Sequence, residues 1–298
     1  RGIVASSAGG PVIVPSAGVG TTGGGSTAIQ ATSGGSGVSG FVSVTVTGLA
    51  STLGGGSLGV NAESAGGPIT IITQSVTTVA GGSTGIRAQT GGVGDDGFIS
   101  VTANGQVSTL GGGSRGIDAY STGGGTVIVQ AQGVSTQGGG AYGIRAASNG
   151  AGSVVVTTAG QVATVADGAD GIVASSQGTV SITTAGVSTQ GAGAEAIRAN
   201  SSGVGSAGSV FITVSGQVST LLDGSDALVA NSTGGPVIVI TQGVSTEGAG
   251  AQGILVNTGG TGADGAISVS AQRAKRKSPV PLLPSVTLRL PTDGVGTA

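Results

Sequence analysis

The sequence predicts an all-β protein, a right-handed parallel β-helix of about ten coils, with about 25–31 residues and three strands in each coil. Three observations support this prediction. The phrase Gly-Ile-x-Ala-x-Ser, or a looser form of it, recurs ten times at intervals of roughly 25–31 residues, a period typical of solenoids. Each repeat contains three short β-favouring segments separated by glycine-rich corners. No useful length of the chain shows the 3.6-residue period of an amphipathic helix.

The first predicted strand of each coil is the Gly-Ile-x-Ala-x-Ser segment, as at residues 143–148. Ile144, Ala146 and Ser148 are two residues apart, so their side chains share one face of a strand, which we expect to point inward. The position between Ile and Ala varies freely among the repeats, which is typical of a solvent-facing column. This column contains four charged residues that are candidates for surface contact: Arg87, Asp118, Arg145 and Arg198.

The second and third predicted strands follow in the same coil. The second is a β-branched run such as Val127-Ile128-Val129, which suits a strand and disfavours a helix. The third has the form Val-x-Thr, as at Val134-Ser135-Thr136. Val and Thr share a face there, and the aliphatic Val directs that face inward. This orientation argues against an outward threonine array that could bind ice.

Shorter and longer repeats often alternate along the chain. The longer coils carry their extra residues before the second strand, for example at Gly94-Asp95-Asp96-Gly97. We therefore expect loops along one edge at roughly every second coil, a place where insertions into repeats often carry binding residues. Asp95 and Asp96 are candidate loop contacts on this basis.

Composition limits the possible classes of protein. Glycine accounts for 65 of 298 residues, but it lacks the strict three-residue period of collagen. The chain has no cysteine, so the coils must be held by backbone ladders and aliphatic stacking. No window approaches the ~18 apolar residues of a membrane span. The sequence begins inside a repeat, and we interpret it as part of a longer chain.

Two regions are predicted, a solenoid domain over 1–272 and a tail over 273–298. The tail is rich in proline, which cannot donate to a central ladder, so an irregular structure is expected there. The solenoid has five basic and eleven acidic residues, and the tail has five basic and one acidic. Nucleic-acid affinity comes mostly from neutralising phosphates, so we expect no nucleic-acid partner for this mildly acidic body.

No cofactor, metal ion or catalytic residue is predicted. Matches to G-x-G-x-x-G, such as Gly138/Gly140/Gly143, lack the following helix that would hold a pyrophosphate, so we interpret them as corners. Corner aspartates such as Asp167 and Asp170 could bind Ca²⁺, but solvated turn residues are the better interpretation. The absence of histidine and cysteine leaves little chemistry for acid–base or nucleophilic catalysis.

The charged column allows two interpretations. Asp118 has an arginine one coil away on either side, and this arrangement could form a groove for acidic sugars. A charge-balanced surface ladder is the favoured alternative, because isolated surface ion pairs are common. A polysaccharide hydrolase or lyase would need converging acids. No long loop with clustered acids is evident, so we do not expect an enzyme.

The repeats resemble the passenger regions of Gram-negative autotransporters and related large exported adhesins. In that family a phrase of the form Gly-x-Ile-x-Thr-x-Gly-x-x-Ala-x-Gly-Ile-x-Ala-x-Ser recurs along a β-helix, and similar phrases occur here at 133–148 and 186–201. The resemblance covers residues 1–271. It implies export through an outer-membrane barrel and a secreted or cell-surface location.

The expected function is therefore that of an adhesive stalk. A stiff rod would present loops for weak, multivalent contact with glycans or extracellular matrix. One alternative is a purely structural extracellular fibre that self-associates end to end through uncapped strand edges. Another is a polysaccharide-active enzyme with the same fold.

Overall fold

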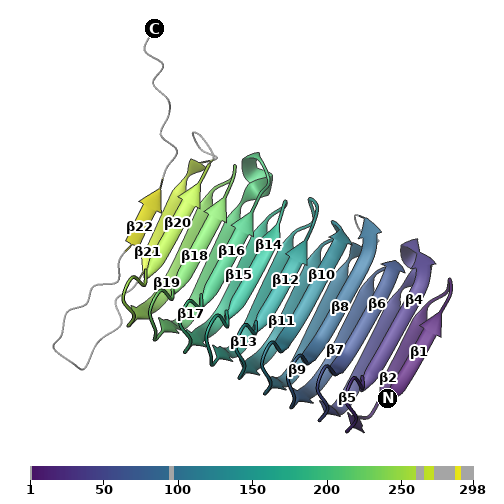
Figure 1. Ribbon diagram of the computed structural model, residues 1–298. Coiled ribbons are helices and arrows are strands. Elements are labelled where there is room, and N and C mark those ends of the chain that lie inside the picture. Colours follow the sequence, from purple (N-terminus) through teal and green to yellow (C-terminus); the bar gives the residue numbers. More distant parts are fainter. Residues whose placement is uncertain (1, 94–96, 260–264, 272–285, 290–298) are drawn as a thin grey trace.

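The chain winds into a parallel β-solenoid of about ten turns (Figure 1). The structure, a computed structural model, describes residues 2–93, 97–259, 265–271 and 286–289. Every strand pair in this part of the chain is parallel and joins equivalent segments of neighbouring coils. The prediction of an all-β solenoid is confirmed.

The strands form two sheets, which we call sheet A and sheet B. Sheet A contains, in order, β1 (Ile3–Ser7), β4 (Ile29–Ser36), β6 (Leu58–Gly66), β8 (Thr84–Val93), β10 (Arg115–Gly123), β12 (Ile144–Ser148), β14 (Ile172–Ser176), β16 (Ile197–Ser201), β18 (Leu228–Ser232), β20 (Ile254–Thr258) and β22 (Val286–Arg289). Sheet B contains β2 (Val12–Ser16), β5 (Val42–Thr52), β7 (Ile69–Thr78), β9 (Ile99–Thr109), β11 (Val127–Thr136), β13 (Val154–Thr164), β15 (Val180–Thr189), β17 (Val210–Thr220), β19 (Val237–Thr246) and β21 (Ile267–Ala271), and β3 (Val19–Thr21) pairs with β5.

The second and third predicted segments are extended, but they join into one element in most coils. β11 contains both Val127–Val129 and Val134–Thr136. Its register against β13 shifts between Ala131 and Val134, which marks the bend where the two segments meet. The first coil keeps them apart, as β2 and β3.

The core consists of inward columns in which like side chains stack. Ile144 and Ala146 of β12 are fully buried, and their register partners in β10 are Ile117 and Ala119. Burying each large aliphatic side chain contributes ~1.5–3 kcal/mol. Thr136 is also buried, which confirms that the threonine of Val-x-Thr points inward there.

Sterics explain why glycine precedes the first strand so often. A Cβ atom on Gly143 would lie 2.6 Å from Val162 Cγ1 and 2.6 Å from the carbonyl oxygen of Gly171. Real Cβ atoms essentially never come this close to other atoms. The tight approach of neighbouring coils therefore favours glycine at this position.

The hydroxyl at the end of the first strand binds neighbouring coils together. Ser232 Oγ donates to the carbonyl of Gly208 in the preceding coil at 2.8 Å and accepts the N–H of Gly235 at 2.7 Å. The donor bond to a glycine carbonyl of the preceding coil recurs at Ser33, Ser64, Thr90, Ser201 and Thr258. Sequence reasoning placed these residues inward, but it did not identify this bond.

Two features account for the alternating coil lengths. β5, β9, β13 and β17 each have 11 residues, whereas β7, β11, β15 and β19 have 10. Extra residues before the sheet B strand also form the short 3-10 helices η1 (Gly37–Gly40) and η3 (Gly205–Gly208). Asp95 and Asp96, at the equivalent place in another long coil, lie outside the described residues.

Part of the predicted irregular tail forms a strand. β22 (Val286–Arg289) pairs in parallel with β20, and Val286 lies opposite Ile254. The segment therefore extends sheet A by one strand. Beyond residue 271, β22 is all that the structure describes.

The corner glycines permit a controlled test of backbone strain. Gly113 has a φ of 68°, and Gly112 beside it has no such positive φ, although both offer open space to an added Cβ. A left-handed conformation costs an L-residue ~1–2 kcal/mol. Gly113→Ala should lower the free energy of unfolding by about that amount, and Gly112→Ala should leave it unchanged or raise it by ~0.4–1 kcal/mol. Urea unfolding followed by circular dichroism would measure both, and equal losses would contradict the argument.

Candidate functional site

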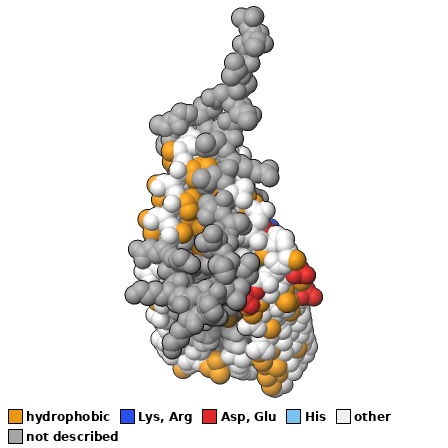
Figure 2. Space-filling model, turned by 90° about the vertical axis from the view of Figure 1, so that its left-hand side faces the viewer, with side chains coloured by type: hydrophobic (Ala, Val, Ile, Leu, Met, Phe, Trp, Pro, Cys, Tyr) orange, Lys and Arg blue, Asp and Glu red, His pale blue; other side chains and the backbone are white. Residues whose placement is uncertain are grey.

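The outer side of sheet A carries the charged and aromatic side chains that could recognise a ligand. All four arginine side chains that the structure describes lie there, together with both tyrosines: Arg87, Arg115, Arg145, Arg198, Tyr120 and Tyr142. Among the other residues that the structure describes, charged side chains are sparse. In the view onto the β21/β22 end, most described side chains are uncharged and only small acidic groups stand out (Figure 2).

The predicted charged column exists in the register of sheet A. Asp118 lies opposite Arg87 on one side and Arg145 on the other. Val173 then separates Arg145 from Arg198. The four candidate residues thus occupy one column, although Arg198 is two coils from Arg145, the nearest other charged residue in that column.

The ion pairs differ from those that the column alone suggested. Asp118 Oδ1 lies 3.2 Å from Arg145 Nη1, and its Oδ2 lies 2.5 Å from Arg115 Nη1. Asp118 is only 6% exposed, which corrects the prediction of a solvent-facing position. Arg87 pairs instead with Glu63, with 3.0 Å between Nη1 and Oε1. Sequence reasoning missed Arg115 and Glu63, because both lie in adjacent columns.

Each tyrosine supports one arginine of this cluster. The guanidinium of Arg145 lies 5.2 Å from the centroid of the Tyr120 ring, and that of Arg115 lies 5.6 Å from the Tyr142 ring. Such cation–π contacts are favourable at this distance. The Tyr120 hydroxyl also accepts a hydrogen bond from Asn149 Nδ2. The signal that could have identified Tyr120 is its position two residues after Asp118, on the same face of the strand.

These residues surround a groove of about 450 Å³, which we call the arginine–tyrosine groove. The side chains that define it are Leu58, Thr84, Arg87, Gln89, Arg115, Asp118, Tyr120 and Arg145. Its three arginines are paired with two carboxylates, those of Asp118 and Glu63. One positive charge is therefore in excess, in a solenoid that is otherwise mildly acidic.

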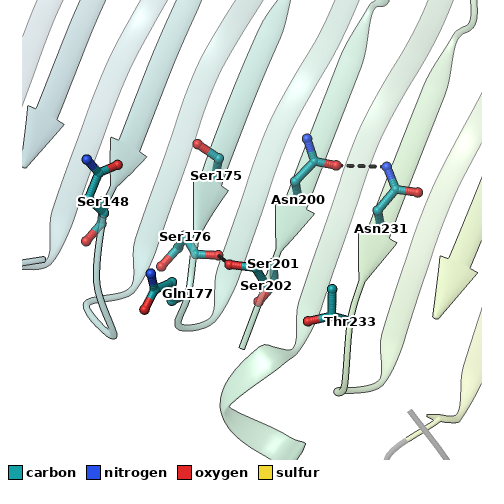
Figure 3. Close-up of a pocket in the computed structure, with 10 residues that line it drawn as sticks. Ser148, Ser175, Ser176, Gln177, Asn200, Ser201, Ser202, Asn231 and Thr233 are labelled. Carbon is teal, nitrogen blue, oxygen red and sulfur yellow. Dashed lines mark hydrogen bonds between the residues drawn. The ribbon is translucent and has the colours of Figure 1, made fainter. Parts of the chain in front are cut away.

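A second groove, of about 610 Å³, continues along the same side of sheet A, and we call it the amide groove. It is lined by Ser148, Asn149, Ser175, Ser176, Gln177, Asn200, Ser201, Ser202, Asn231 and Thr233. Figure 3 shows Asn200 and Asn231 side by side, where Asn231 Nδ2 donates to Asn200 Oδ1 at 2.8 Å. The two grooves meet where Asn149 binds Tyr120.

Arg198 belongs to a separate, acid-rich cluster. Its Nη2 lies 3.5 Å from Asp170 Oδ2, and its Nε binds Glu195. The hydrogen bond that Arg198 donates to Glu195 raises the pKa of the Arg198 guanidinium above its ordinary value. Two carboxylates thus surround one arginine here, the reverse of the balance in the arginine–tyrosine groove.

The carboxyl group of Asp170 is unusual because it is buried. Burial raises its pKa above the ordinary value of 3.8, although the N–H of Glu195 and the charge of Arg198 act in the opposite direction. That N–H donates to Asp170 Oδ1 at 2.9 Å. The prediction that Asp170 is a solvated turn residue is therefore wrong.

Other corner aspartates also bind the next coil. Asp167 Oδ1 accepts the N–H of Ala192 at 2.9 Å, and Asp223 Oδ1 accepts that of Ala249 at 2.7 Å. Both aspartates are exposed, as predicted for turn residues. In the described ranges, no group of three or more His, Cys, Asp or Glu side chains is placed to hold a metal ion.

No protein-family model matches this sequence, and no match was found among curated proteins or solved structures. In the part of the chain that the structure describes, no helix is both long and apolar enough to cross a membrane.

The buried carboxyl of Asp170 predicts a pH dependence. Its raised pKa means that the folded state binds more protons at this site than the unfolded chain does. The stability from this group is thus present at low pH and is lost as the pH rises above 3.8. Asparagine keeps an oxygen for the Glu195 N–H but does not titrate. The stability of Asp170→Asn relative to wild type should therefore increase from about pH 4 to about pH 7.

Urea unfolding across this pH range would measure the difference. Asp167→Asn is the matched control, because exposed Asp167 also accepts a backbone N–H from the next coil. It separates the effect of burial from the effect of that hydrogen bond. A relative stability of Asp170→Asn that stays flat or falls with pH would contradict the prediction.

Proposed function

We propose that this chain is a stiff, non-enzymatic stalk from a secreted or surface-displayed bacterial protein of the autotransporter or large-adhesin kind. We further propose that the outer side of sheet A makes weak, repeated contacts with glycans. The observation that carries the proposal is the alignment of hydrogen-bonding side chains across successive coils, in the two adjoining grooves.

The stiffness of the stalk is supported by the bonding between coils. Strands of both sheets pair with their equivalents in the neighbouring coil, and the Ser232-type hydroxyl bonds add side-chain links. Each coil contacts only its neighbours, and the stacked coils share one continuous core. At ~4.8 Å per coil, ten coils span roughly 45 Å.

Contact with glycans is supported by the side chains in the grooves. Sugar hydroxyls both donate and accept hydrogen bonds, and the amides and hydroxyls of Gln177, Asn200 and Ser202 can do the same. Tyr120 adds a half-buried ring, and the amphipathic ring of tyrosine favours binding interfaces. A polysaccharide would meet similar groups at successive coils, so many weak contacts would add up.

Binding without turnover is supported by the surroundings of the carboxylates. Glycosidases commonly place two carboxyl groups on either side of the scissile bond. Among the described residues that line the arginine–tyrosine groove, Asp118 is the only carboxylate, and two arginines bind it. The described residues lining the amide groove include no carboxylate.

The test is binding of the 298-residue chain to an array of glycans and matrix proteins, with released sugar measured in the same wells. We expect saturable binding without release, and tighter binding to long polysaccharides than to their short oligomers. Released sugar would overturn the non-enzymatic proposal. Absence of binding would overturn the contact role, and fibres forming in the same samples would favour the structural-fibre alternative.

A pair of matched variants locates the contact. The double variant Gln177→Ala/Asn200→Ala removes two amides from the amide groove. It should weaken glycan binding by roughly thirtyfold, since each of the two amides contributes a net hydrogen bond of ~1 kcal/mol. Thr183→Ala/Thr213→Ala alters exposed side chains of sheet B and should leave binding unchanged. Equal effects of the two double variants would contradict a contact on sheet A.

A further inference from the structure

We propose that the arginine–tyrosine groove binds the carboxylate of an acidic sugar, so that this stalk recognises polysaccharides containing uronic acids. The inference rests on the proposed glycan-binding function and adds the class of glycan and the residues that select it. It follows from the balance of charge in the groove, the geometry of its arginines and its connection to the amide groove.

The arginine–tyrosine groove carries an excess of positive charge. Three arginines line the groove, and Asp118 is the only carboxylate among the described residues that line it. Glu63 neutralises Arg87 from outside the groove. Arg115 and Arg145 therefore share the single charge of Asp118, and one anionic group from a ligand would complete the balance. The Arg198 cluster has no such excess, because two carboxylates already surround that arginine.

Arg115 and Arg145 both keep hydrogen-bond donors for a ligand and remain accessible. Arg115 and Arg145 each contact Asp118 through Nη1. A guanidinium has five N–H donors in a fixed fork, so most donors of each side chain are left for a second partner. The side chains are 38% and 34% exposed, respectively. A planar carboxylate matches such a fork and can bind it through both oxygens.

The two arginines are held in place before any ligand arrives. Asp118 binds the two guanidinium groups through different oxygens. The rings of Tyr142 and Tyr120 lie against Arg115 and Arg145, respectively. Long flexible side chains lose less conformational entropy on binding when they are already fixed, which favours affinity.

The arginine–tyrosine groove adjoins the amide groove, which offers a path for neighbouring sugar units. Asn149 belongs to the amide groove and donates to the hydroxyl of Tyr120 in the arginine–tyrosine groove. A polysaccharide with its carboxylate at Arg115 and Arg145 could therefore place further sugar units along the amides and hydroxyls of the next coils. Neutral units would suffice there, because the described side chains of the amide groove carry no charge.

The test compares two ligands that differ in one charge per sugar. Oligomers of galacturonic acid carry a carboxylate on each unit, and their methyl esters have the same backbone without that charge. Calorimetry with the full chain should show at least tenfold tighter binding of the acid form, and a weaker preference at high salt because the contact is electrostatic. Equal affinity for acid and ester would overturn the inference.

Variants test whether the preference for the acid form over the methyl ester arises in the arginine–tyrosine groove. Arg145→Gln should remove the tenfold preference, and Arg145→Lys should restore part of it by returning the charge without the fork. Arg198→Gln is the matched control, because it lies in the same column but outside the groove, and it should keep the full preference. Equal losses in Arg145→Gln and Arg198→Gln would contradict the assignment.

Two further measurements complete the test. If Arg145→Gln unfolds, as circular dichroism would reveal, Arg145→Lys replaces it, because it keeps a positive charge beside Asp118. Retention of the full preference in Arg145→Lys would then count against the groove. Dextran sulfate should compete less well than galacturonate oligomers, and equal competition would overturn selection of a carboxylate. Binding of neutral glycans alone would leave the proposed function intact and refute this inference, whereas no glycan binding at all would refute both.

Discussion

The constraint on which this structure depends is the register between neighbouring coils. Each residue of a strand lies next to its equivalent one coil away, at the ~4.8 Å spacing of paired strands. At that distance a side chain must suit a copy of itself, and the columns of isoleucine and alanine satisfy this condition. The same closeness excludes a Cβ at Gly143 and brings the Ser232 hydroxyl within bonding distance of the preceding coil.

Register also determines how outward residues combine into a site. Residues from different coils become neighbours without a loop to carry them, so the two grooves are made of contributions from β8, β10, β12 and the strands that follow. Because the strands are fixed by their pairing, the side chains start from a rigid surface. Variation at the exposed positions can then change the surface chemistry while the buried columns, and hence the fold, stay the same.

Much of the fold could be predicted from sequence, because equivalent positions of successive repeats are paired in the sheets. The positions of Arg87, Asp118 and Arg145 relative to one another follow from counting residues, and the sheet confirms them. The ion pairs that these side chains form could not be predicted by counting residues. An arginine side chain is longer than the spacing between coils, so Arg87 and Arg115 select partners from adjacent columns, and their choice depends on three-dimensional detail. The second and third predicted segments of most coils likewise join through a bend, and no residue type in the sequence predicts that bend.

The alternation of longer and shorter strands in sheet B has a consequence for how such a rod could change length. Loss of a single coil would place two strands of equal length beside each other and break this alternation. Loss or gain of two coils preserves the alternation, and the separation of Ile29 from Ile86 equals that of Val60 from Ile117. Gene duplication or deletion would therefore be tolerated best in steps of two coils, which makes the rod longer or shorter by about 10 Å at a time.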